Sequence, residues 1–303
     1  MIGIARGVRS VLIAIAAMAA LAFPVRAEDR VDVVATFSIL GDFAANVGGA
    51  RVRVTTLVGP GGDTHVYTPT PSDAKTVARA KLVVVNGLGL EGWLPRLVVS
   101  SGGKASTVVA SKGVTPRKSE GGRDRDAFNA DPHAWQSVAN AKIYVANIRD
   151  ALAAADPAGA DIYRANAAAY LDKLDALERE VRQEIGRIPP DRRSVITTHD
   201  AFGYFSAAYG IAFVAPQGVS TDTEPGAREV ATIIAQIRKQ KIPAVFLENI
   251  RDSRLVRQIA SETGARIGGT LYSDSLTDEK GEAPTYIEMV RHNIKALSSA
   301  LSG

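Results

Sequence analysis

Short β-branched segments alternate with longer segments in which apolar residues recur every three or four positions. Four of the short segments lie in the first part of the chain, at Val31–Phe37, Val52–Val58, Lys81–Gly87 and Ser106–Ser111. Short runs rich in Val and Thr are typical of strands, and helical segments between them are typical of βα units. This part of the chain therefore predicts a parallel sheet flanked by helices.

The same alternation returns in the second half of the chain. Strand-like segments occur at Ser194–Thr198, Ile211–Ala215, Ala244–Glu248 and Ala265–Ser273, again with helical segments between them. The two halves share this layout but show no residue-level repeat. We therefore expect an α/β fold of two lobes, each a mostly parallel sheet flanked by helices.

A long helix separates the two halves. An Ala-rich helical pattern covers Gln136–Leu152, and a second pattern starts after Pro157 and continues to about Gly186. At about 1.5 Å per residue the second helix is about 40 Å long, which exceeds the span of a small lobe. We expect it to join the lobes as a rigid backbone, although a surface helix of a single domain would show the same pattern. The predicted organisation is a first lobe at 28–157, a linking helix at 158–187 and a second lobe at 188–303.

The N-terminal residues have the composition of a secretory signal peptide. Arg6 and Arg9 precede the apolar run Val11–Phe23, and the segment ends in a small residue at Ala27. The run is shorter than the roughly 18 to 20 apolar residues that span a bilayer. We therefore predict that residues 1–27 are a cleaved signal peptide and that the mature protein is soluble, does not span the membrane and resides in the periplasm.

Cys is absent from the chain. The sequence thus offers no disulfide, no thiolate for a metal and no Cys after the signal to carry a lipid, so we expect no lipid anchor. The predicted signal accounts for three of the four positive charges in the formal net charge of +4. Since Lys and Arg are not concentrated in one stretch, we expect no nucleic-acid partner.

Three of the four histidines follow predicted strands or the loop after them. His65 follows the second predicted strand, His199 the fifth, and His133 the charged segment after the fourth. Asp274 follows the last predicted strand in the same way. Ligands of open α/β sheets bind beyond the carboxyl ends of the strands, where loops converge. We therefore expect His65, His133, His199 and Asp274 to meet in one crevice.

Three imidazoles and one carboxylate suit a borderline divalent cation such as Zn²⁺. Mn²⁺ and other first-row ions remain open, since geometry rather than affinity alone sets selectivity. Each residue also has an ordinary alternative role. His65 and His133 could be polar loop residues, His199 could cap the next helix, and Asp274 could form a turn.

Other polar residues have predicted roles near or away from this site. A metal-bound imidazole needs an acceptor for its second ring nitrogen, and Asp63, Asp131 or Asp200 could supply it. His292 lies in the amphipathic C-terminal helix, and we predict it on the solvent face.

Two rival functions use the same ligands. A zinc hydrolase would leave one metal position to water, and Glu248, at another strand end, would be its candidate base. Glu248 could instead be a structural carboxylate near the crevice. The chain has no HExxH motif that would mark such an enzyme. A partner-binding protein could instead hold metal for structure only. We expect a binding protein rather than an enzyme.

The segments around the four candidate residues resemble a known family. They are "DTHVYTPTPSD" (Asp63–Asp73), "DPHAW" (Asp131–Trp135), "THDAFGYF" (Thr198–Phe205) and "LYSDSL" (Leu271–Leu276). Their order and content resemble the cluster A-I, or ZnuA/TroA-like, solute-binding proteins of bacterial ABC transporters for zinc and manganese. The resemblance covers essentially the whole mature chain.

This resemblance implies a ligand set and a function. His65, His133, His199 and Asp274 take the family's four ligand positions, and the helix at 158–187 takes the place of its rigid backbone. The protein would capture Zn²⁺ between the lobes and deliver it to the membrane subunit of an ABC permease. A periplasmic metallochaperone could load the site. We expect the protein to be a monomer.

The chain departs from the family pattern in three places. Thr64 replaces the usual Pro before the first ligand. The charged, Gly-rich segment 112–131, which we expect to be a mobile surface loop, contains no His, unlike the His-rich loop of many zinc-specific members. His199 stands where manganese-type members usually carry Glu, and its nitrogen favours zinc. We therefore expect Zn²⁺, with Mn²⁺ as the alternative.

Overall fold

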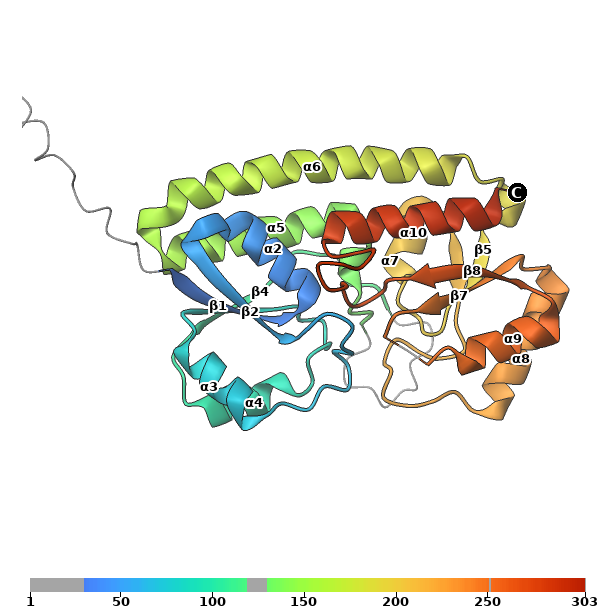
Figure 1. Ribbon diagram of the computed structural model, residues 1–303, viewed down its shortest axis with the longest axis horizontal. Coiled ribbons are helices and arrows are strands. Elements are labelled where there is room, and N and C mark those ends of the chain that lie inside the picture. The colour runs from blue at the N-terminus through green and yellow to red at the C-terminus, as the bar shows by residue number, and fades with distance from the viewer. Residues whose placement is uncertain (1–29, 119–129, 251, 303) are drawn as a thin grey trace, which may run out of the picture.

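The computed structural model describes residues 30–118, 130–250 and 252–302. Within them the chain forms two four-stranded sheets surrounded by helices, as Figure 1 shows. The predicted signal peptide and the centre of the predicted loop at 112–131 lie outside the described residues.

Both sheets are parallel and have the same kind of strand order. The first follows β2-β1-β3-β4 and the second β6-β5-β7-β8. Parallel sheets are covered on both faces, which explains why β1 and β3 are almost entirely buried. The strands are β1 (Val31–Phe37), β2 (Val52–Val58), β3 (Leu82–Val85), β4 (Ser106–Val109), β5 (Ser194–Ile196), β6 (Ala212–Val214), β7 (Ala244–Glu248) and β8 (Arg266–Leu271).

All eight predicted strands are confirmed, and with them the predicted two-lobed α/β fold. β1, β2 and β7 have the predicted bounds, whereas the other strands are shorter at one or both ends. The apolar pattern continues past the last paired residue because the loops at the strand ends are themselves buried. The sequence pattern therefore shows where a strand lies but not where its pairing stops.

Helices cover both faces of each sheet. In Figure 1, α3 and α4 lie below the first sheet, and α8 and α9 lie on the side of the second sheet away from α10. The helices are α2 (Ser38–Gly48), α3 (Pro71–Arg79), α4 (Leu94–Ser101), α5 (Val138–Ala155), α6 (Ala160–Gly186), α7 (Gly203–Tyr209), α8 (Ala227–Gln240), α9 (Arg254–Thr263) and α10 (Tyr286–Leu301). Short 3₁₀ turns are η2 (Gly49–Arg51), η3 (Ala134–Gln136), η4 (Pro157–Gly159) and η5 (Pro190–Arg192).

The 27-residue helix α6 packs against both lobes. It contacts α2 and α5 beside the first sheet and α7 and α10 beside the second, and Figure 1 shows it running along the top of the whole molecule. The prediction of a long backbone helix is confirmed. Its buried stripe consists of Tyr163, Ala167, Tyr170, Leu174, Leu177, Val181 and Ile185.

His292 is not on the solvent face, so that prediction is wrong. Its side chain is 23% exposed, its Nε2 atom lies 3.0 Å from the carbonyl oxygen of Thr270, and its ring packs against Tyr272. Helix α10 contacts both β8 and α6. A helix packed on two sides buries a wider face than the single apolar stripe indicates.

The described ends of the segment 112–131 are mostly exposed, with buried residues at two positions. Val114 and Asp131 are buried. Lys118 and Ala130 form an antiparallel bridge that closes the segment. The exposed residues at these ends agree with a position on the surface. The mobile loop stays a prediction, because the centre of the segment lies outside the described residues.

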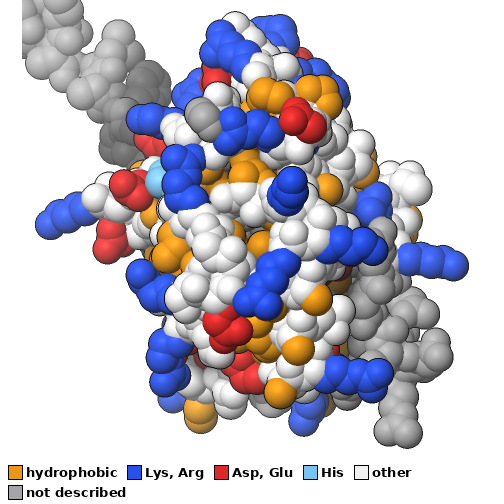
Figure 2. All heavy atoms as spheres, turned by 90° about the vertical axis from the view of Figure 1, so that its right-hand side faces the viewer, with side chains coloured by type: hydrophobic (Ala, Val, Ile, Leu, Met, Phe, Trp, Pro, Cys, Tyr) orange, Lys and Arg blue, Asp and Glu red, His pale blue; other side chains and the backbone are white. Residues whose placement is uncertain are grey.

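The end of the molecule that carries α8 and α9 shows a mixed surface. In Figure 2, Lys and Arg side chains are spread over this face among acidic and apolar side chains. In the part of the chain that the structure describes, no helix combines the length and the apolar composition that a membrane crossing requires.

The stripe on α6 provides a test of the packing. Replacing the fully buried Leu174 with Ala should lower the free energy of unfolding by about 2–5 kcal/mol, because it leaves a cavity in the core. Ile162→Ala on the same helix, where the side chain is 46% exposed, should cost less than about 1 kcal/mol. Denaturant unfolding measures both, and equal losses would contradict the burial of this stripe.

Candidate metal centre

Four side chains from distant parts of the chain meet where the two lobes face each other. His65, His133, His199 and Asp274 each offer one ligand atom, and these atoms all lie within 4.8 Å of one another. The Nε2 atoms of His65 and His133 are 3.2 Å apart. Asp274 Oδ2 lies 3.2 Å from His65 Nε2 and 3.1 Å from His199 Nε2. The structure thus brings together all four residues that the sequence singled out.

The parallel sheets explain this convergence. His65 lies in the loop after β2, His133 in the segment after β4, His199 after β5 and Asp274 after β8. Strands of one parallel sheet end at the same edge, so their loops emerge together. Figure 1 shows the strands of both sheets directed towards the middle of the molecule.

The loop that carries His65 is fixed through its backbone. Asp63 Oδ1 accepts a hydrogen bond from the His65 backbone N–H at 3.0 Å, and Asp63 Oδ2 accepts one from the Thr221 hydroxyl of the second lobe at 2.7 Å. Thr64 is completely buried, and its carbonyl oxygen accepts from Trp93 Nε1 at 2.9 Å. The sequence predicts Asp63 as a possible acceptor for a ring nitrogen, whereas in the structure its carboxylate accepts from the backbone N–H of His65.

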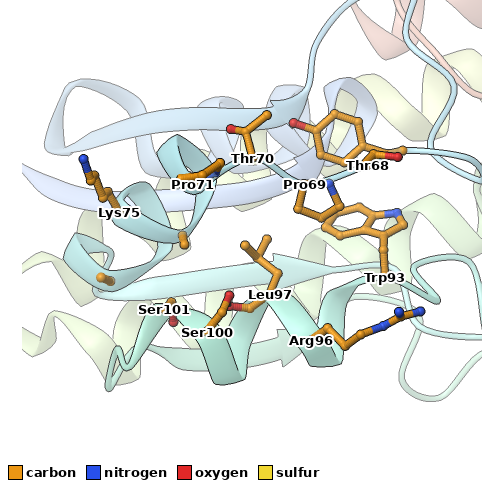
Figure 3. A pocket seen from close by; sticks show the side chains of 13 residues that line it. Thr68, Pro69, Thr70, Pro71, Lys75, Trp93, Arg96, Leu97, Ser100 and Ser101 are labelled. Atoms are coloured by element: carbon orange, nitrogen blue, oxygen red, sulfur yellow. The ribbon is translucent and has the colours of Figure 1, made fainter.

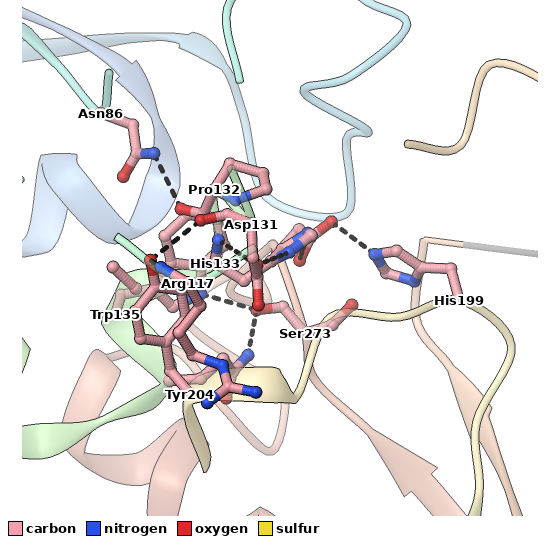
Figure 4. Close-up of polar contacts among 12 residues, drawn as sticks. Asn86, Arg117, Asp131, Pro132, His133, Trp135, His199, Tyr204 and Ser273 are labelled. Atoms are coloured by element: carbon pink, nitrogen blue, oxygen red, sulfur yellow. Dashed lines mark hydrogen bonds and ion pairs between the residues drawn. The ribbon is translucent and has the colours of Figure 1, made fainter. Parts of the chain in front are cut away.

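Asp131 orients the fully buried His133. Its Oδ1 atom lies 2.9 Å from the Nδ1 atom of the ring and also accepts from the His133 backbone N–H at 2.9 Å. The Tyr204 hydroxyl donates to the Asp131 carbonyl oxygen at 3.1 Å, as Figure 4 shows. In the neutral ring, an acceptor at Nδ1 keeps the proton on that nitrogen, so that Nε2 is available to a metal. The prediction that Asp131 could hold a second ring nitrogen agrees with this geometry.

Glu248 does the same for His199. Glu248 Oε2 lies 2.6 Å from His199 Nδ1, and Oε1 accepts from the backbone N–H groups of Thr198 and His199 at 2.7 Å and 3.0 Å. Glu248 is only 4% exposed. Of the two roles that the sequence suggests for this residue, the geometry agrees with the structural carboxylate near the crevice, because Glu248 holds an imidazole.

Asp274 is completely buried, and the residues on either side of it are tied to the first lobe. The carbonyl oxygen of Ser273 accepts from Trp135 Nε1 at 2.9 Å. On the other side, the Leu276 backbone N–H donates to the Ser38 hydroxyl at 3.0 Å. These contacts fix a second-lobe carboxylate against first-lobe elements.

Charges within the site shift the pKa values of the two innermost imidazoles. Burial lowers the pKa of His133, but the carboxylates of Asp274 and Asp131 outweigh burial and raise it to about 9. Burial likewise disfavours the charged form of His199, but Glu248 and Asp274 raise its pKa well above the usual range. Without a metal, these two rings therefore hold protons at neutral pH.

The pKa values of His65 and Asp274 are shifted as well. Burial lowers the pKa of His65, so this ring is the readiest to stay neutral. Burial would raise the pKa of Asp274, but the charges of His133 and His199 hold it well below its usual range. A divalent cation can replace the two protons without leaving a buried carboxylate uncompensated.

Metal binding should therefore depend on pH. Below the His133 pKa of about 9, protons compete with the ion for the imidazoles, so the apparent affinity should rise with pH. Between pH 6 and 8 we expect about a tenfold gain per unit for each proton displaced. Chelator competition at several pH values measures the slope. His292→Gln, which removes an imidazole outside the site, should keep the same slope, and a flat profile would contradict the protonated metal-free site.

Comparison with known proteins agrees with this arrangement. The model of the ZnuA family, described as zinc-uptake complex component A, periplasmic, matches residues 33–300. The iron-binding protein YfeA of Yersinia pestis is 38% identical over 266 residues, which are 88% of this chain and 85% of YfeA. The manganese ABC transporter substrate-binding lipoprotein PsaA of Streptococcus pneumoniae is 32% identical over 280 residues, 90% of each chain.

A solved structure supports the same assignment. The periplasmic zinc binding protein TroA of Treponema pallidum superposes with a TM-score of 0.85 at 31% identity, covering 90% of this chain and 100% of TroA. The sequence resemblance to ZnuA/TroA-like proteins is confirmed. The chain belongs to the ZnuA family, the metal-binding solute-binding proteins of ABC transporters, and is not an enzyme.

Proposed function

We propose that the protein captures Zn²⁺ in the periplasm and delivers it to the membrane subunit of an ABC permease. The observation that carries this proposal is the convergence of three imidazoles and one carboxylate where the lobes meet. His65 and His133 come from the first lobe, and His199 and Asp274 from the second. An ion held by both lobes is released when the lobes separate, which suits capture and delivery.

The spacing and the chemistry of the donor atoms fit zinc. Ligand atoms around a tetrahedral Zn²⁺ with bonds of about 2.0–2.1 Å lie about 3.3–3.4 Å apart. Four contacts within the site, at 3.1 to 3.5 Å, lie close to that value, and all ligand atoms lie within 4.8 Å of one another. Three of the four donors are imidazole nitrogens, which suit Zn²⁺ better than the harder Mn²⁺.

Manganese is the second candidate, because both oxygens of Asp274 face the site. Oδ2 lies near His65 and His199, while Oδ1 lies 3.5 Å from His133 Nε2. A carboxylate that binds through both oxygens adds a fifth bond, and carboxylate donors suit Mn²⁺. Family membership does not choose between the ions, since PsaA is named for manganese, YfeA for iron and TroA for zinc.

The contacts that hold each ligand suggest how release proceeds. The segment around Asp274 is tied to the first lobe through Ser273 and Leu276. His199 is instead held by Glu248 of its own lobe. A small outward movement of the second lobe would therefore separate His199 from the other three ligands first. The long helix α6, packed on both lobes, limits larger movements.

Competition between ions tests the proposed cargo. Protein purified without added metal should bind Zn²⁺ in preference to Mn²⁺. His199→Ala should lower the Zn²⁺ affinity at least about 100-fold, because an apparent binding energy of about 10–16 kcal/mol is shared among four ligands. His292→Ala serves as the control and should bind like the unaltered protein. Preference for Mn²⁺ would favour the second candidate, and unchanged binding by His199→Ala would contradict the ligand set.

A further inference from the structure

The loop between β3 and α4 contacts the segment that carries His133. Asn86 is completely buried, and its Nδ2 atom donates to the carbonyl oxygen of Pro132 at 2.9 Å, directly before His133, as Figure 4 shows. Its Oδ1 atom accepts from the Tyr144 hydroxyl at 2.6 Å, and its carbonyl oxygen accepts from the Ser111 hydroxyl at 2.6 Å. The amide cannot turn away from Pro132 without breaking buried hydrogen bonds.

The same loop contacts the segment that carries His65. Trp93 is 8% exposed, and its Nε1 atom donates to the carbonyl oxygen of Thr64 at 2.9 Å, directly before His65. The indole ring packs edge-on against Tyr67, with ring centroids 5.1 Å apart. Figure 3 shows Trp93 at one end of a groove between α3 and α4, next to Pro69. Packing thus fixes the indole ring, and its N–H group is directed at the loop that carries His65.

A buried carboxylate holds the loop in shape. Glu91 Oε1 accepts from the Asn86 backbone N–H at 2.6 Å and from the Thr36 hydroxyl at 2.7 Å, and Oε2 accepts from the Gly87 backbone N–H at 3.1 Å. Leu88, inside this turn, has a φ of 55°. A non-glycine residue keeps such a conformation only where its surroundings enforce it. The loop is therefore held in one conformation by buried hydrogen bonds.

The second lobe has a similar arrangement at the equivalent strand. β3 and β7 occupy the same place in the two strand orders. Glu248, the last residue of β7, holds the ring of His199. Asn249 follows it, and its Nδ2 atom donates to the carbonyl oxygen of Ser275, directly after Asp274, at 3.1 Å. In both lobes the Asn that directly follows this strand donates to a carbonyl oxygen next to a ligand residue and is itself outside the set of four ligands.

We propose that Asn86 and Trp93 are positioning residues for the metal, an inference that rests on the proposed function. They join the separate loops of His65 and His133 to one rigid turn. The 3.2 Å separation of the two Nε2 atoms is thereby set before the ion arrives. Loss of contacts that orient metal ligands typically lowers metal affinity about 10- to 100-fold.

Two variants and one control test this role. Trp93→Phe removes the N–H group but keeps an aromatic ring, and Asn86→Leu removes the donor at similar volume. Tyr163→Phe removes a different buried donor, the hydroxyl that lies 2.6 Å from Asp156 Oδ2 near the start of α6. Chelator competition measures Zn²⁺ affinity, and the visible absorption spectrum of the Co²⁺-loaded protein reports the coordination geometry.

We expect both Trp93→Phe and Asn86→Leu to bind Zn²⁺ about 10- to 100-fold more weakly and to show altered Co²⁺ spectra, while Tyr163→Phe changes neither. Unaltered Co²⁺ spectra in the variants would overturn the positioning role, whatever happens to their unfolding midpoints. If Asn86→Leu does not fold, Trp93→Phe decides the question, because its ring still fills the site of the indole. Failure of the unaltered protein to bind Zn²⁺ and Co²⁺ would instead overturn the proposed function.

Discussion

A buried carboxylate between the two lobes is the feature on which the rest of the structure depends. Asp274 is completely buried, and an isolated charge in such a position costs more than any single packing contact contributes. His199 Nε2 at 3.1 Å and His65 Nε2 at 3.2 Å compensate it. Because these rings come from different lobes, the lobes have to meet in one particular arrangement for the charge to be satisfied.

Carboxylates and imidazoles alternate through the centre of the molecule. Asp131 contacts His133, His133 faces Asp274, Asp274 contacts His199, and His199 contacts Glu248. The outer carboxylates raise the affinity of the rings for protons in the metal-free protein and for a cation in the loaded one. Under the proposed function, a metal ion would replace protons on the Nε2 atoms of these rings.

Periodicity and position predicted the fold and the four converging residues, because both depend on local sequence. Strand ends on one edge of a parallel sheet must lie close together, which placed His65, His133, His199 and Asp274 correctly. No local pattern marks a donor that acts across the chain.

The residues that hold the ligand segments from distant positions therefore carry no such local pattern in the sequence. Trp93 lies 29 positions from its acceptor Thr64, and Asn86 lies 46 positions from Pro132. The sequence leaves the role of Glu248 open between a base and a structural carboxylate for the same reason, since its partner His199 is 49 positions away. One signal was available: Asn86 follows the strand β3 and so lies at the sheet edge from which the ligand loops emerge.

Under the proposed function, both the choice of ion and its release depend on Asp274. Asp131 and Glu248 fix the rings of His133 and His199, so these donors present the same Nε2 atoms to any ion. Under the proposed function, Zn²⁺ would bind Asp274 through one oxygen, whereas Mn²⁺ would bind it through two. The Asp274 segment is tied to the first lobe through Ser273 and Leu276 as well as to the second through Ser275, whereas His199 is held by Glu248 of the second lobe. If His199 separates from the ion first, an ion bound through both oxygens of Asp274 would keep more bonds than an ion bound through one oxygen. Release should therefore be easier for the ion that Asp274 binds through one oxygen.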